Sequence, residues 1–78
     1  MGRKMIIFQD PKAIADFTHI IEKYPYDMDL KRGRYVVDAK EFEDVFHLGT
    51  NHIIELKVYE NAENLGKLWE ELSPYMAA

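Results

Sequence analysis

The sequence contains no cysteine, and it has few basic residues, with 10 lysines and arginines against 14 aspartates and glutamates. Without cysteine the chain can form neither a disulfide nor a thiolate zinc site. Its hydrophobic core must therefore stabilise the fold unaided, and a reducing cytoplasm suits it as a location. The net charge of -4 argues against DNA and RNA as partners, because binding to phosphates requires clustered basic side chains.

Long apolar segments and recognisable catalytic motifs are also missing. The longest fully apolar run covers only residues 5–8, whereas a membrane-spanning helix needs about 20 apolar residues. No signal-peptide pattern precedes this run, so we expect a soluble protein that does not enter a membrane. The only serine is Ser73, and the chain has no glycine-rich phosphate loop. We therefore expect no nucleophilic catalysis, no cofactor and no bound metal.

The composition favours one folded domain over residues 1–78. Hydrophobic residues make up 47% of the chain and charged residues 31%, which argues against disorder. A chain of 78 residues is long enough for a single core and too short for two.

The first part of the chain predicts a strand followed by a helix. Residues 4–8 predict the strand, since all but Lys4 are apolar. Asp10 followed by Pro11 is a typical helix start, because aspartate caps the free N-H groups of the first turn. The helix is expected over residues 11–23. Its apolar stripe contains Ile14, Phe17, Ile21 and Tyr24, with Ile20 beside it.

The middle and last parts predict three more strands and two more helices. Residues 27–32 alternate polar and apolar, Gly33 marks a turn, and residues 35–37 complete a hairpin. A short helix over residues 41–48 ends at Gly49, and a strand follows over residues 52–59. Asn61 is expected to cap a final helix, whose apolar stripe contains Leu65, Leu68, Trp69, Leu72 and Met76. The order β-α-β-β-α-β-α predicts an α+β fold, a four-stranded antiparallel sheet with helices on one face.

The middle of the chain contains a motif made of Val37-Asp38-Ala39-Lys40, then Val45, then Leu48-Gly49. This motif resembles the regulatory-serine signature of the HPr phosphocarrier family, V-N-A-K-S-I-M-G-V-M-S-L-G. The order and lengths of the elements agree with the family over residues 4–76. The resemblance implies the HPr-like fold, an open-faced β-sandwich.

The chain departs from this family at the position of the active-site histidine. In the family, a histidine at the start of the first helix accepts phosphate from phosphoenolpyruvate by way of Enzyme I. Here that position holds Asp10, and Lys12 replaces the neighbouring arginine. A carboxylate repels phosphate and cannot form a phosphoramidate. The resemblance therefore implies the fold without the phosphocarrier activity, and the chain is not expected to be an enzyme.

The regulatory serine of the family is replaced by Glu41. A kinase finds no hydroxyl at this position, although a carboxylate at a helix start partly imitates phosphoserine. One hypothesis is therefore a natural HPr-like regulatory protein of the sugar phosphotransferase and catabolite-repression system. The simpler interpretation is that Glu41 favours the helix N-terminus.

The short helix over residues 41–48 differs most from the family pattern. Val45 and Leu48 are spaced to enter the core together, whereas Phe42 and Phe46 share another face and are expected to be exposed. The alternative is that one or both phenylalanines belong to the core. In the family, the outer face of this helix and of the first helix docks onto partner proteins. We therefore predict a non-catalytic module that binds a protein through Phe42, Phe46, His47, Glu43, Lys40, Lys12, Asp16 and His19.

Two further hypotheses concern the origin and the pH response of this surface. The raised aromatic content of this helix favours an HPr-like scaffold engineered to bind a new target, because drift in a natural paralogue, the alternative, would more often introduce mixed polar residues. His19 and His47 are expected on the same surface, so their protonation near pH 6 would change binding; the alternative is that both are inert. A metal site of His19, His47 and Asp16 is disfavoured by their spacing. The free chain is expected to be monomeric.

Overall fold

The computed structural model describes residues 1–77. It has four strands and three α-helices in the predicted order, with two short 3-10 turns near the C-terminus. The elements are β1 (Gly2–Ile6), α1 (Pro11–Ile21), β2 (Met28–Arg32), β3 (Tyr35–Asp38), α2 (Phe42–Leu48), β4 (Ile54–Val58), η1 (Ala62–Asn64), α3 (Gly66–Leu72) and η2 (Ser73–Tyr75).

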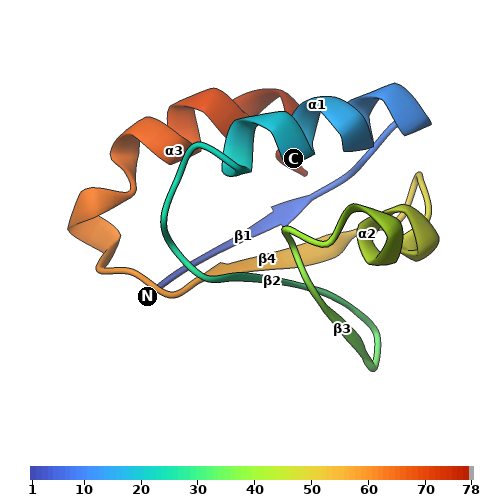
Figure 1. Cartoon of the computed structure of the whole chain (residues 1–78), viewed down its shortest axis with the longest axis horizontal. Coiled ribbons are helices and arrows are strands. Elements are labelled where there is room, and N and C mark those ends of the chain that lie inside the picture. The colour runs from blue at the N-terminus through green and yellow to red at the C-terminus, as the bar shows by residue number, and fades with distance from the viewer. Residues whose placement is uncertain (78) are drawn as a thin grey trace.

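The four strands form one antiparallel sheet in the order β1-β4-β2-β3. Figure 1 shows α1 and α3 side by side over the sheet, with α2 near β3, so all three helices lie on one face. The opposite face of the sheet has no helix in the part of the chain that the structure describes. The α+β open-faced sandwich predicted from the sequence is confirmed.

The core lies between the sheet and the helices. Alternation along the strands sends Met28, Leu30 and every second residue of β4 towards the helices, as the period-two pattern predicted. The buried apolar side chains are Ile6, Phe8, Ile14, Phe17, Ile21, Met28, Leu30, Ala39, Val45, Leu48, Ile54, Leu56, Val58, Leu65, Leu68 and Leu72.

Several predicted boundaries and one predicted core residue need correction. The first strand covers residues 2–6, and Phe8 lies beyond it in the core. Helix α1 ends at Ile21, two residues before the predicted end. Asn61 precedes the 3-10 turn η1 and makes no side-chain cap, because the chain must turn once more to bury Leu65 before α3 begins. Trp69 is half-buried at the edge of the core, with the Lys4 ammonium 5.5 Å from its ring centroid.

A hydrogen bond between the turn that follows α1 and helix α3 makes stability dependent on pH. The Tyr24 hydroxyl donates to a Glu71 carboxylate oxygen at 2.9 Å. This bond lowers the pKa of Glu71, with help from Lys23, whereas burial and the same bond raise the pKa of Tyr24 to about 12. The contribution of Glu71 to the free energy of unfolding is therefore present at neutral pH and is lost as the pH falls below 4.5, the ordinary pKa of glutamate. The contribution of Tyr24 is lost as the pH rises from 10 towards 12.

Replacing Glu71 by glutamine tests this pH dependence. The wild-type chain is expected to melt at a higher temperature than Glu71→Gln at pH 7, and the difference is expected to shrink below pH 4.5. Thermal unfolding followed by circular dichroism over a pH series measures it. Glu70→Gln is the matched control, since Glu70 is exposed on the same helix. An equal difference in melting temperature at neutral and acidic pH would contradict the prediction.

Candidate functional site

The start of α1 is an ordinary helix cap. Asp10 has an extended backbone, and its carboxylate accepts a hydrogen bond from the backbone N-H of Ala13 at 2.8 Å, as the sequence predicted. Pro11 occupies the first helical position. The Asp10 carboxylate therefore stabilises the start of α1.

Helix α2 is short, and two cations hold its ends. Its N-cap residue, Glu41, makes no side-chain cap hydrogen bond. Just before the helix, the Lys40 ammonium donates to the Tyr24 carbonyl in the turn that follows α1, at 2.6 Å. At the other end, the Arg32 guanidinium donates to the Leu48 carbonyl at 2.7 Å. These bonds tie α2 to that turn and to the hairpin, so that its outer face has a fixed position.

Phe42 and Phe46 lie on that outer face. Their side chains are 43% and 46% exposed, whereas Val45 and Leu48 on the opposite face are buried. The two rings are neighbours, with centroids 6.1 Å apart, and His47 lies beside Phe46 at 6.3 Å. The exposure predicted from the helical spacing is confirmed, and the alternative that either ring enters the core is wrong. Exposed aromatic pairs of this kind are typical anchors of protein interfaces.

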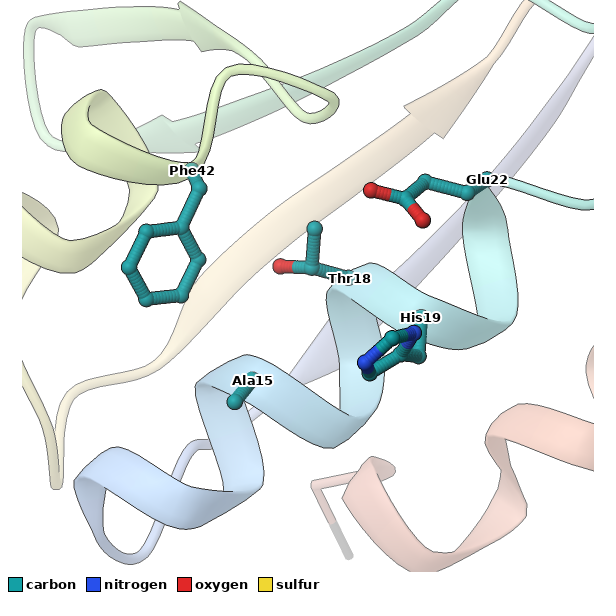
Figure 2. A pocket seen from close by; sticks show the side chains of 5 residues that line it. All are labelled: Ala15, Thr18, His19, Glu22 and Phe42. Atoms are coloured by element: carbon teal, nitrogen blue, oxygen red, sulfur yellow. The ribbon is translucent and has the colours of Figure 1, made fainter.

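A hollow of about 180 Å³ lies between α1 and α2. Figure 2 shows the Phe42 ring projecting from α2 towards α1, where Thr18 and Ala15 form the base and His19 and Glu22 stand at the side. The Thr18 hydroxyl donates back to the Ile14 carbonyl at 2.9 Å, so it has a partner already. The base therefore presents mainly methyl groups, and an apolar side chain fits it.

The charged side chains around this surface are mostly acidic. Glu41, Glu43 and Asp44 are exposed on α2, and Glu22 is exposed on α1. Of the predicted basic residues, Lys12 forms an ion pair with Asp16 at 3.0 Å, which raises the pKa of Lys12. Lys40 is half-buried and bonded to a carbonyl, as described above. The free charge next to the two phenylalanines is therefore negative.

The two histidines named from the sequence do not meet. His19 is exposed and lines the hollow between α1 and α2. His47 lies beyond Phe46 and lines a second hollow, between α2 and β3. The two histidines therefore border different hollows, and an effect of their protonation on binding stays a prediction. Within residues 1–77 there is no group of three or more histidine, cysteine, aspartate or glutamate side chains able to hold a metal ion.

Sequence reasoning missed three residues of the hollow. Ala15, Thr18 and Glu22 follow one another at helical spacing, next to the apolar stripe of α1. Two small residues followed by an acid are a weak signal for a binding hollow, because such a stripe forms one only when a second helix packs beside it. The packing of α2 against α1 supplies that context.

Taken together, the fold and this surface define a class of protein, an open-faced α+β sandwich with an exposed aromatic pair on α2 beside α1. Comparison with solved structures gives the same fold. The crystal structure of HPr-C-His from Thermoanaerobacter tengcongensis is similar with a TM-score of 0.73, 18% sequence identity, and coverage of 92% of this chain and 90% of that one. The fold of this chain is therefore HPr-like.

Sequence comparisons and membrane topology add two findings. The chain matches no protein-family profile and no curated protein sequence. None of the helices in residues 1–77 has the length and apolar character required to cross a bilayer.

Proposed function

We propose that this chain is a non-catalytic module that binds a protein partner through the outer face of α1 and α2. The observation that carries the proposal is the pair Phe42 and Phe46, exposed next to a hollow whose base is apolar. Helix α2 is held at both ends, so little conformational freedom is lost when a partner covers it.

The charge around the surface suggests the chemistry of the partner. In the proposed complex, an apolar side chain of the partner occupies the hollow beside Phe42. Lysine or arginine side chains of the partner lie around it and approach Glu22, Glu43 and Asp44. We assign Lys12, Asp16, Lys40 and His47 to the rim of this surface, and His19 borders the hollow itself.

Phosphate transfer does not fit the first helix. The carboxylate of Asp10 occupies the start of α1 and is bonded to the backbone there. An incoming phosphate would meet a negative charge at the position where the family has its histidine. A scaffold redesigned for a new target and a natural paralogue that has lost phosphotransfer both fit this proposal.

Replacing both phenylalanines by alanine tests the proposed surface. Proteins captured from a lysate by the wild-type chain are identified, and each is then purified and its affinity is measured by calorimetry. For a true partner, Phe42→Ala/Phe46→Ala is expected to weaken binding by at least about tenfold, because exposed aromatic anchors dominate such interfaces. The melting temperature is expected to stay unchanged or rise, because both rings are exposed and neither belongs to the buried core.

The matched control removes two apolar side chains of similar exposure on the open face of the sheet. Met5 and Ile53 are 49% and 63% exposed, and Met5→Ala/Ile53→Ala is expected to bind as tightly as the wild type. If no captured protein distinguishes the two double variants, the proposal is wrong. Unfolding of the phenylalanine variant would show instead that these rings belong to the core.

A second candidate function rests on Glu41. This residue occupies the N-cap position of α2, and its exposed carboxylate makes no cap hydrogen bond. A free carboxylate at this position fits a regulatory protein of the sugar phosphotransferase system in which Glu41 imitates phosphoserine. Replacing Glu41 by serine or glutamine would then abolish binding to a regulator that reads phosphoserine. Incubation with phosphoenolpyruvate and Enzyme I, followed by intact-mass measurement, detects any remaining phosphate transfer.

A further inference from the structure

The two edges of the sheet differ in a way that is independent of the α1–α2 surface. At the β1 edge the end of the chain runs alongside the strand: Ile7 N-H donates to the Tyr75 carbonyl and Ala77 N-H to the Met5 carbonyl, both at 2.8 Å. An isolated bridge joins Ile6 and Met76 there. At the opposite edge, β3 pairs only with β2, and no other strand of residues 1–77 covers it.

The open edge is apolar and suited to pairing. Tyr35 and Val36 are 68% and 58% exposed, and β3 contains neither proline nor lysine, the residues that commonly block an edge strand. The Ala39 N-H donates to the Met28 carbonyl on β2. Because bonding alternates along an antiparallel pair, the backbone groups of Val36 point away from β2, towards the open edge.

The sequence of this edge is complementary to itself. In an antiparallel pair of two β3 strands centred on Val36, each Val36 lies opposite Val36 of the second copy. Arg34 then lies near Asp38 of the second copy at both ends of the pair, so that two opposite charges meet twice. Tyr35 of each copy lies opposite Val37 of the other copy. The backbone N-H and C=O groups of Val36 point outwards in both copies, so in this register the two Val36 residues hydrogen-bond to each other.

A hollow beside the edge provides room for the tyrosine. It has a volume of about 260 Å³ and is lined by Arg32, Tyr35, Val37, Asp44, His47 and Leu48. Because Val37 lines this hollow, Tyr35 of the second copy, opposite Val37, lies on the same face and next to it. Main-chain pairing combined with a side-chain pocket is the usual mode of recognition at a sheet edge.

We propose that a second copy of this chain pairs with β3 to form a symmetric dimer with a continuous eight-stranded sheet. A pair of short strands buries little surface, so the dissociation constant is expected to be on the order of 100 µM. The expectation of a monomer then holds at concentrations well below this value. The α1–α2 surface plays no part in the contact, except that Asp44 and His47 border it.

Sedimentation equilibrium between about 10 µM and about 1 mM tests the proposal. The wild-type mass is expected to rise from the monomer value of 9.2 kDa towards twice that value. Val36→Lys places two like charges opposite each other at the centre of the pair and is expected to keep the chain monomeric throughout. Ile53→Lys, a charge introduced at an equally exposed apolar position outside β3, is expected to dimerise like the wild type.

A charge exchange distinguishes this register from others. Arg34→Glu places two acids together and is expected to weaken the dimer about tenfold or more, whereas Arg34→Glu combined with Asp38→Lys restores opposite charges and is expected to recover it. Equal melting temperatures at 10 µM, measured for each variant, exclude unfolding as the cause. A wild-type mass of 9.2 kDa at 1 mM, or a Val36→Lys variant that dimerises, would overturn the proposal.

Discussion

Phe17→Ala is expected to cost about 3–5 kcal/mol of folding free energy. A domain of this size has a total stability of roughly 5–10 kcal/mol, so a large part of it would be lost. Phe17 is completely buried, and its ring makes edge contacts with Phe8 at 5.1 Å and with Tyr75 at 5.8 Å between centroids. Alanine would leave a cavity at the point where α1, the end of β1 and the C-terminal turn meet.

Urea denaturation measures this loss. Phe46→Ala is the matched control, because it makes the same chemical change at a side chain that is 46% exposed. We expect Phe46→Ala to change the free energy of unfolding by less than about 1 kcal/mol. If Phe17→Ala and Phe46→Ala lost similar free energies of unfolding, the difference in burial between the two rings would be contradicted.

The fold was predictable because its periodic residues are also its core residues. Ile14, Phe17 and Ile21 follow the helical period, and all three are buried. The 3-10 turn before α3 was not predictable. Asn61 is a good capping residue in isolation, but the position of α3 is set by the burial of Leu65, which depends on the sheet beneath it.

The family resemblance indicates the fold for a physical reason. The signature residues Ala39, Val45 and Leu48 are buried, and Lys40 holds the entry to α2 through the Tyr24 carbonyl. The residues of α2 that differ from the signature are all exposed: Phe42, Glu43, Asp44, Phe46 and His47. The positions that agree with the signature are thus the ones that hold the fold, and the positions that differ lie on the surface.

The candidate site was predictable only where a single helix defines it. The exposure of Phe42 and Phe46 follows from their spacing relative to Val45 and Leu48 within α2. The hollow between α1 and α2 depends on the packing of two helices, so Ala15, Thr18 and Glu22 could not be assigned to it in advance. The separation of His19 from His47 depends on the same packing.

Contacts between residues far apart along the chain could not be predicted from the sequence either. Arg32 is 16 residues from Leu48 along the chain, and the sequence places it only at the end of a predicted hairpin strand. In the structure it bonds to the last residue of α2. The position of the candidate surface therefore depends on a side chain that no local pattern singles out.

Arg32→Met is the second substitution with a large expected effect. The guanidinium supplies a charged hydrogen bond to the Leu48 carbonyl, which has no partner within α2, and its positive charge lies at the negative end of that helix. Methionine keeps an aliphatic stem and removes both contributions. We expect a loss of about 1.5–3 kcal/mol, together with local loosening of α2.

Two measurements separate the local effect from the global one. Urea denaturation gives the total loss, and amide hydrogen exchange is expected to accelerate more at Val45, whose N-H is bonded to the Glu41 carbonyl, than in β4. Arg34→Met, measured at low concentration, is the matched control, because Arg34 is exposed in the same hairpin. If α2 then exchanges no faster than β4 in Arg32→Met, the Arg32 bond does not hold the helix, and the fixed position of Phe42 and Phe46 must have another cause.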